Sequence, residues 1–159
     1  MEKKFENYVI SLARAEKALR VGEHIKHVTF PLLKDTKLLL KILTESYLSI
    51  MHAINAILQY EYAMKRTSIT SNARDNLIIF RNKCAGRYGI SEKELGELRE
   101  LIFLAEMHKK SPLEFTKHGK IVIMSDSSQV YTIDYENMAD FLELAKGMYE
   151  KAKEGIKRL

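Results

Sequence analysis

The sequence predicts a mainly α-helical domain, a bundle of about five helices with one β-hairpin inserted before the C-terminal helix. Apolar residues recur at three- and four-residue steps along most of the chain, which is the period of one helical face. Between Lys117 and Ile133 this period gives way to runs of β-branched residues that are typical of strands. A length of 159 residues, 46% of them hydrophobic, fits a single domain with one core, covering residues 1–159.

The first helix is expected from Lys3 to about Gly22. Its apolar residues form one stripe, made up of Phe5, Tyr8 or Val9, Leu12, Ala15 and Leu19. Gly22 permits a left-handed turn at a helix C-terminus, and Pro31 is not expected to continue a helix. The two residues are therefore expected to bracket a short irregular connection.

The second helix is expected from about Lys34 to Lys65 and has two distinct faces. One face is apolar and carries Leu43, Tyr47, Ile50, Ile54 and Ile57. The other is a stripe of small residues made up of Ser46, Ser49, Ala53 and Ala56. Small side chains let a second helix approach closely. That second helix could belong to the same chain or to a second subunit.

Two shorter helices follow. The third is expected from Ser71, whose hydroxyl can cap free amides, to about Gly86. Its inward side chains are expected to be Leu77, Ile78, Phe80 and Cys84. The fourth begins at a capping box formed by Ser91 and Glu94, and Pro112 marks its end.

The hairpin is expected at about residues 117–133. Its strands are Ile121 to Met124 and Val130 to Ile133, joined by a polar turn. Two strands alone are marginally stable in water, so the hairpin is expected to pack on the helices or pair with another chain. Asp134 can cap the last helix, which carries an unbroken apolar stripe.

Composition restricts the classes of protein. The formal net charge is +5, which favours anionic partners. The single cysteine, Cys84, excludes an intramolecular disulfide and a CxxC pair, and it is expected in the core of a protein of the reducing cytoplasm. The charged N-terminus shows no secretion signal. The longest apolar stretch, Leu38 to Leu58, contains too many polar residues for a membrane span.

Two segments resemble the HEPN superfamily. In the second helix, Tyr47 is followed by an apolar-His-Ala run, and the match is carried by Tyr47, Met51, His52, Ala53, Ala56 and Leu58. The last helix, Ala139 to Lys153, looks like the closing helix of that family. The resemblance covers about a third of the chain and implies an all-helical bundle that often forms homodimers. Members include nucleases, toxins and modules associated with RNA or nucleotides.

Active members of that family carry an Arg followed by four to six residues and then a His. The family's His acts on the RNA 2′-hydroxyl or the leaving group, and its Arg steadies the phosphate. Here the corresponding residues, Arg99 and His108, are separated by eight residues. A nine-residue step on a helix turns about 900° and rises roughly 13 to 14 Å, which places the two side chains on opposite faces. Arg20 and His27 have a six-residue gap but lie at the end of the first helix, where the match is attributed to chance.

The best candidate site is a basic segment at the end of the fourth helix and the entry to the hairpin. Cations at helix ends and in loops can reach a phosphate without disturbing the core, and here they are His108, Lys109, Lys110, Lys117, His118 and Lys120. The alternative is a solvated helix end whose cations offset the helix dipole. Phe115 and Tyr131 could stack on bases or pin the hairpin to the bundle.

Other candidate residues have structural explanations beside the functional ones. Lys65, Arg66, Arg81, Lys83 and Arg87 form a second basic group, which extends a binding face if the third helix lies beside the fourth. His52 is expected in the core or in an interface, with a role as a ligand-contacting base as the alternative. Glu23, His24 and His27, near a helix end, are weak metal-ligand candidates. No metal or cofactor is expected.

These observations favour a non-catalytic HEPN-like module that binds nucleic acid or a nucleotide, as a homodimer through the small-residue face of the second helix or through a neighbouring helix. One alternative is a metal-independent ribonuclease in which Arg99 and His108 form a nonstandard site, for which assembly across a dimer is one arrangement. The other is a regulatory or antitoxin-like domain that binds a protein partner, with the hairpin supplying an edge strand.

Overall fold

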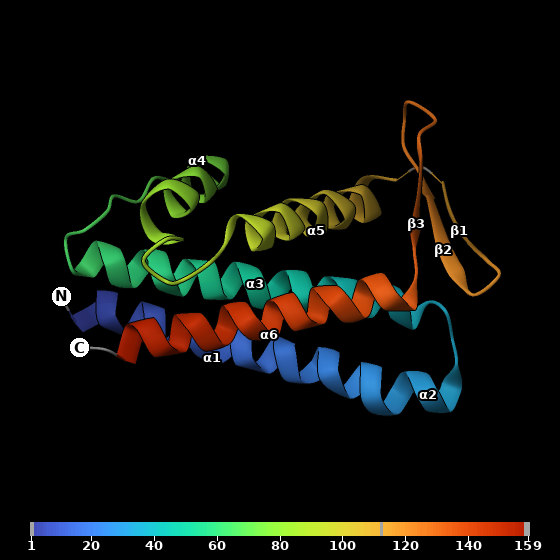
Figure 1. Cartoon of the computed structure of the whole chain (residues 1–159), viewed down its shortest axis with the longest axis horizontal. Helices are drawn as coiled ribbons and strands as arrows, with labels where there is room; N and C mark the ends of the chain where they lie inside the picture. Colours follow the sequence, from blue (N-terminus) through green and yellow to red (C-terminus); the bar gives the residue numbers. More distant parts are fainter. Residues whose placement is uncertain (1, 112, 158–159) are drawn as a thin grey trace.

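The computed structural model describes residues 2–111 and 113–157, and within them it shows a mainly α bundle with a small antiparallel sheet before the last helix. Three long helices, α1, α3 and α6, lie side by side, and α4 and α5 cover one side of them (Figure 1). The sheet lies at one end of this bundle, and the two chain termini lie at the other end (Figure 1). The predicted fold class is confirmed.

The first helix is longer than the sequence predicted. The segments α1 (Glu2–His24), η1 (Ile25–Thr29) and α2 (Phe30–Leu33) are contiguous, so the helix runs through both Gly22 and Pro31. It ends at Lys34, whose positive φ of 50° forms the left-handed turn that was expected at Gly22. A Cβ on Gly22 would lie 2.8 Å from Leu142 Cδ1 of α6. Gly22 therefore allows close packing between helices and does not end one.

Pro31 is tolerated because η1 has π-helical hydrogen bonding. The amide of Phe30 donates to the carbonyl of Ile25, five residues earlier, so the turn before the proline is widened. Pro31 follows this widened turn as the second residue of the α-helical segment α2, so its ring and its missing amide proton fall where the α-helical hydrogen-bonding pattern is already interrupted. The expected irregular connection is therefore wrong, and a widened helical turn stands in its place.

The long central helix is α3 (Leu38–Ala63). Its stripe of small residues packs against α1 of the same chain, and all four side chains are fully buried: Ser46, Ser49, Ala53 and Ala56. Ser49 Oγ donates a hydrogen bond of 2.8 Å to the carbonyl of Ala15, a close approach that small side chains permit. A homodimer through this face is therefore wrong, because α1 already covers it.

The next helix contains α4 (Ala73–Ile79) and its π-helical continuation η2 (Phe80–Cys84). Its cap is Asn72, whose side chain accepts from the amide of Asp75 at 3.0 Å, and not the expected Ser71. Helix α5 (Glu92–Lys110) begins at the predicted capping box of Ser91 and Glu94. The predicted stop at Pro112 lies outside the described residues.

The sheet has one strand more than the predicted hairpin. Its strands are β1 (Leu113–Lys117), β2 (Lys120–Met124) and β3 (Val130–Ile133), paired antiparallel in that order. The predicted pair corresponds to β2 and β3, and the prediction missed β1. One face of the sheet buries Ile121, Ile123 and Ile133 against the helices.

The last helix, α6 (Tyr135–Lys157), begins after Asp134, whose carboxylate accepts from the amide of Asn137 at 2.8 Å. The predicted cap is thus confirmed. Its apolar stripe enters the core between α1, α3 and α5, with Met138, Ala145, Met148 and Ala152 fully buried.

Candidate nucleic-acid interface and neighbouring surfaces

The predicted basic segment divides into two groups at opposite ends of β1. His108, Lys109 and Lys110 lie in the last turn of α5. Lys117, His118 and Lys120 surround the turn between β1 and β2. A five-residue strand spans roughly 13 Å, so the two groups do not form one compact site.

The group at the end of α5 is partly occupied by contacts within the chain. His108 Nδ1 lies 2.7 Å from Glu114 Oε2 of β1, and both side chains are about one-quarter to one-third exposed. Lys109 Nζ lies 5.6 Å from the centre of the Tyr47 ring on α3, within range of a cation–π interaction. Lys110 is exposed. This end of α5 therefore offers fewer free cations than the sequence suggested.

The turn between β1 and β2 is basic and solvent-exposed. Lys117 and Lys120 face each other in register, and the two-residue turn between them consists of His118 and Gly119. Both turn residues have positive φ angles, 52° and 75°, as a type I′ hairpin turn requires. In the described part of the chain, neither lysine forms an ion pair with a carboxylate. We call Lys117, His118 and Lys120 the basic turn.

The face of the sheet that points away from the helices is apolar and exposed. Leu113, Phe115 and Val130 are 48%, 40% and 56% exposed, and Val122 lies opposite Phe115 on β2. This open face also includes Met124, which lies in register with Leu113 and Val130. Phe115 is thus an exposed aromatic side chain beside the basic turn.

Tyr131 has the structural role that the sequence offered as its alternative. Its ring packs edge-to-face on Phe103 of α5, with the ring centres 4.9 Å apart. Its hydroxyl donates to Gln129 Oε1 at 2.7 Å. Tyr131 therefore pins the sheet to the bundle, and Phe115 is the one of the two that remains free to stack on a base.

Arg99 and His108 face different parts of the molecule. Arg99 lies beside α4, in a groove between α4 and α5, whereas His108 contacts β1. The two side chains are not brought together within one chain, as the nine-residue spacing predicted.

A buried carboxylate binds two of the five cations in the second basic group. Glu61 of α3 is 1% exposed and forms ion pairs with Arg66 and Arg87. Arg66 Nη2 lies 2.5 Å from Glu61 Oε2, and this hydrogen bond raises the pKa of Arg66. Two of the five cations therefore share one negative charge, and Arg81 forms no ion pair among the described residues.

Arg81 lies with Arg74 and Arg99 around a groove of about 150 Å³ between α4, η2 and α5. The third helix therefore does lie beside the fourth, the arrangement on which a shared basic surface depended. We call this feature the arginine groove, and its apolar lining includes Leu77, Ile78 and Ile102.

Ile78 was expected to face inward but is 45% exposed at the groove. Sequence reasoning missed Arg74, although its seven-residue separation from Arg81 places both on one helical face.

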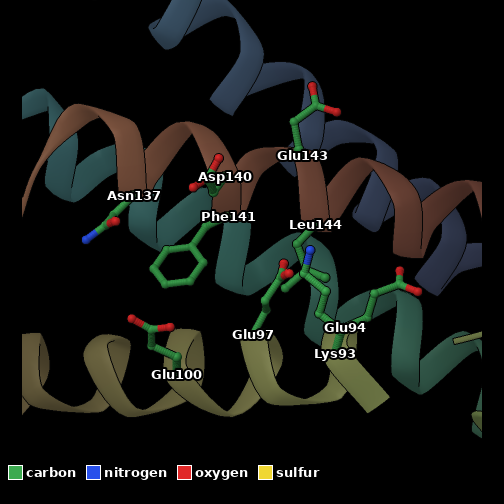
Figure 2. Close-up of a pocket in the computed structure, with 9 residues that line it drawn as sticks. All are labelled: Lys93, Glu94, Glu97, Glu100, Asn137, Asp140, Phe141, Glu143 and Leu144. Atoms are coloured by element: carbon green, nitrogen blue, oxygen red, sulfur yellow. The ribbon is translucent and has the colours of Figure 1, made fainter. Parts of the chain in front are cut away.

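A larger cleft of about 490 Å³ lies between α5 and α6 and is acidic (Figure 2). Its carboxylates recur at three-residue steps on each helix, a signal that sequence reasoning missed: Glu94, Glu97 and Glu100 on α5, and Asp140 and Glu143 on α6. Glu94 is already bonded to Lys151 Nζ at 2.7 Å, and Glu143 points away from α5 (Figure 2). The carboxylates therefore do not converge on one point.

Among the described residues, no group of three His, Cys, Asp or Glu side chains is placed to hold a metal ion. Glu23, His24 and His27 thus do not form such a group. No helix in the described ranges combines the length and the apolarity that crossing a membrane requires.

Two further titratable residues, His52 and Cys84, have pKa values that are shifted by burial. Burial, followed by the charge of Arg14, lowers the pKa of His52, which is half-buried on α3. Cys84 is 1% exposed, and burial raises the pKa of its thiol to about 11. Cys84 is therefore a core residue, as predicted.

Comparisons with protein-family models, with curated proteins and with solved structures find no match for this chain.

Proposed function

We propose that this chain is a non-catalytic, HEPN-like module that binds single-stranded nucleic acid through the basic turn and the open face of the sheet. The observation that carries the proposal is the cross-strand pair of Lys117 and Lys120. Like charges directly opposite each other destabilise a hairpin, and no carboxylate among the described residues neutralises this pair. A bound strand, with one negative charge on each phosphate, would offset this repulsion.

The neighbouring aromatic side chain favours a single strand over a duplex. Phe115 precedes Lys117 by two residues, so both side chains lie on the same face of β1, roughly 7 Å apart at Cα. Its ring is 40% exposed. An unpaired base can stack on such a ring while the lysines contact its phosphates, an arrangement common in proteins that bind single strands.

Binding without catalysis fits the surroundings of the two candidate catalytic residues. His108 is hydrogen-bonded to Glu114, and Arg99 lines a separate groove. Neither belongs to the basic turn, so a strand bound there would not lie between them.

The test is fluorescence anisotropy with labelled single-stranded RNA and DNA oligonucleotides over a series of salt concentrations. Changing Lys117 and Lys120 together to Glu should abolish tight binding and reduce the slope of log affinity against log salt by about 1.4, because two phosphate contacts are lost. Phe115→Ala should weaken binding by about 1 to 3 kcal/mol, the range for one stacked base.

A matched control changes Lys146 and Lys153 of α6 to Glu. These exposed lysines give the same change in net charge at a distant surface. The proposal is wrong if this control weakens binding as much as the hairpin variant does, or if the native protein binds neither oligonucleotide at low salt.

A further inference from the structure

The arginine groove combines free positive charge with an apolar floor. Arg74 and Arg81 come from the helix formed by α4 and η2, and Arg99 comes from α5. Between them lie aliphatic side chains that include Ile78 and Ile102. This surface is distinct from the basic turn, because the groove lies between α4, η2 and α5, whereas the basic turn joins β1 to β2.

The three arginines are not neutralised by the chain itself. In the described part of the protein, none of them forms an ion pair, and the side chains that line the groove include no Asp or Glu. The side chain of Arg81 makes a long hydrogen bond, 3.4 Å from its Nε to Asn82 Oδ1. Arg66 and Arg87, by contrast, share the buried carboxylate of Glu61. The groove therefore presents three guanidinium groups to an external anion.

The lining argues against a nucleic acid as the occupant. Stacking needs an exposed aromatic face, but the aromatic side chain of the groove, Phe80, has no exposed surface. The exposed apolar groups are aliphatic, and Ile78 is the most prominent of these at 45% exposure. Aliphatic side chains of a partner fit such a floor better than bases do.

The volume argues against a whole small molecule. Pockets that enclose small ligands have volumes of roughly 300 to 1,000 Å³, and this groove offers about 150 Å³. It can take one or two side chains of a larger partner, as grooves that receive an amphipathic peptide do. Guanidinium groups bind carboxylates in a bidentate manner, which suits Asp and Glu on that peptide.

We infer that the arginine groove docks an acidic amphipathic segment of a partner protein. Aliphatic side chains of that segment enter between Ile78 of α4 and Ile102 of α5. Its carboxylates pair with Arg74, Arg81 and Arg99 at the rim. The chain would then join a nucleic acid bound at the sheet to a protein bound at α4 and α5, although the groove does not depend on the nucleic-acid proposal.

The test is selection from a displayed library of random peptides on the native protein, with counter-selection on a variant in which Arg81 and Arg99 are both changed to Glu. Enriched peptides should combine Leu, Ile or Val with Asp or Glu. Their affinity, measured by fluorescence polarisation, should fall about tenfold or more in the double Arg variant, because two charge-assisted contacts become repulsive. Ile78→Asp should weaken binding similarly, and its partly exposed position should allow it to fold.

The matched control changes Arg14 and Lys17 of α1 to Glu, which alters the net charge equally on another face and should leave peptide affinity unchanged. Enrichment of basic peptides, or no enrichment that depends on the arginines, would overturn the inference. Loss of RNA affinity in the double Arg variant without loss of peptide binding would do the same. So would conversion of a native dimer to monomers by that variant in light scattering, because the occupant would then be a second copy.

Discussion

Glu61, buried near the end of α3, forms an ion pair with Arg87, which follows η2. The same carboxylate accepts two hydrogen bonds from Arg66, and the hydroxyl of Tyr88 lies 3.3 Å from its Oε2. These contacts join α3 to the segment between η2 and α5. They also engage two of the five cations of the second basic group, whereas Arg81 forms no ion pair among the described residues and lines the arginine groove.

Glu61→Gln should lower the free energy of unfolding by about 2 to 3 kcal/mol. The substitution keeps the size of the side chain but removes its charge, which weakens charge-assisted bonds to both arginines. The loss stays below that of a fully buried pair because Arg66 and Arg87 are 41% and 49% exposed and can regain water. Urea denaturation followed by circular dichroism measures it.

Glu100→Gln is the control for this prediction. Glu100 is exposed on α5, and its side chain lines the acidic cleft. Removing one of several neighbouring negative charges should leave stability unchanged or raise it slightly. Equal losses in the two variants would mean that the Glu61 network contributes no specific stability.

Two glycines of α6 should respond in opposite directions to alanine. A Cβ on Gly155 would clash with the ring of Tyr88, which is 8% exposed and cannot move freely, so Gly155→Ala should destabilise the protein by about 1 to 3 kcal/mol. A Cβ on Gly147 would meet no atom within 4 Å, so Gly147→Ala should stabilise the helix by about 0.5 to 1 kcal/mol. Thermal unfolding compares the two, and a destabilising Gly147→Ala would show that the helix packs differently there.

His52 should titrate below the usual range of histidine. Burial disfavours its charged form, and the neighbouring charge of Arg14 adds to this effect, so the pKa of His52 is lowered from 6.5 in the folded state. Its contribution to stability is then fully present above pH 6.5 and is lost as the pH falls, because the unfolded chain binds the proton more readily. NMR titration measures this pKa. Arg14→Gln should raise it in part, and a native value at or above 6.5 would contradict the assigned burial.

The helices could be predicted because their signals are local. The period of apolar residues, the capping box of Ser91 and Glu94, and the Asp134 cap each depend on residues within one or two turns. The errors at Gly22 and Pro31 have a different origin. Position 22 has no room for a Cβ because Leu142 of α6 lies against its backbone, and Pro31 is accommodated by a π-helical turn. The pattern of neighbouring residues in the sequence indicates neither feature.

The candidate site was predicted only in part, because the fold decides which cations form ion pairs within the chain and which remain free. The cations of the basic turn could be read from the sequence, but the turn itself and the pairing of His108 with Glu114 depend on β1, whose alternating residues Leu113 to Lys117 were not recognised as a strand. The pairing of Arg87 with Glu61 depends on how α3 meets the segment after η2, whereas Arg66 lies only five residues from Glu61 in the chain. The arginine groove likewise requires α4 to lie beside α5.

Lys120→Glu separates the requirements of folding from those of binding. Opposite Lys117, a glutamate would replace a repulsive cross-strand pair with an attractive one, so the variant should be more stable by about 0.2 to 1 kcal/mol. The same change should weaken binding of single-stranded RNA, because a phosphate contact is replaced by a repulsive charge. Thermal unfolding and fluorescence anisotropy on one protein preparation measure both effects. A gain in stability with a loss of RNA affinity would mean that the lysine pair lowers stability but provides affinity for anions. A loss of both stability and affinity would show that Lys120 acts through the fold alone.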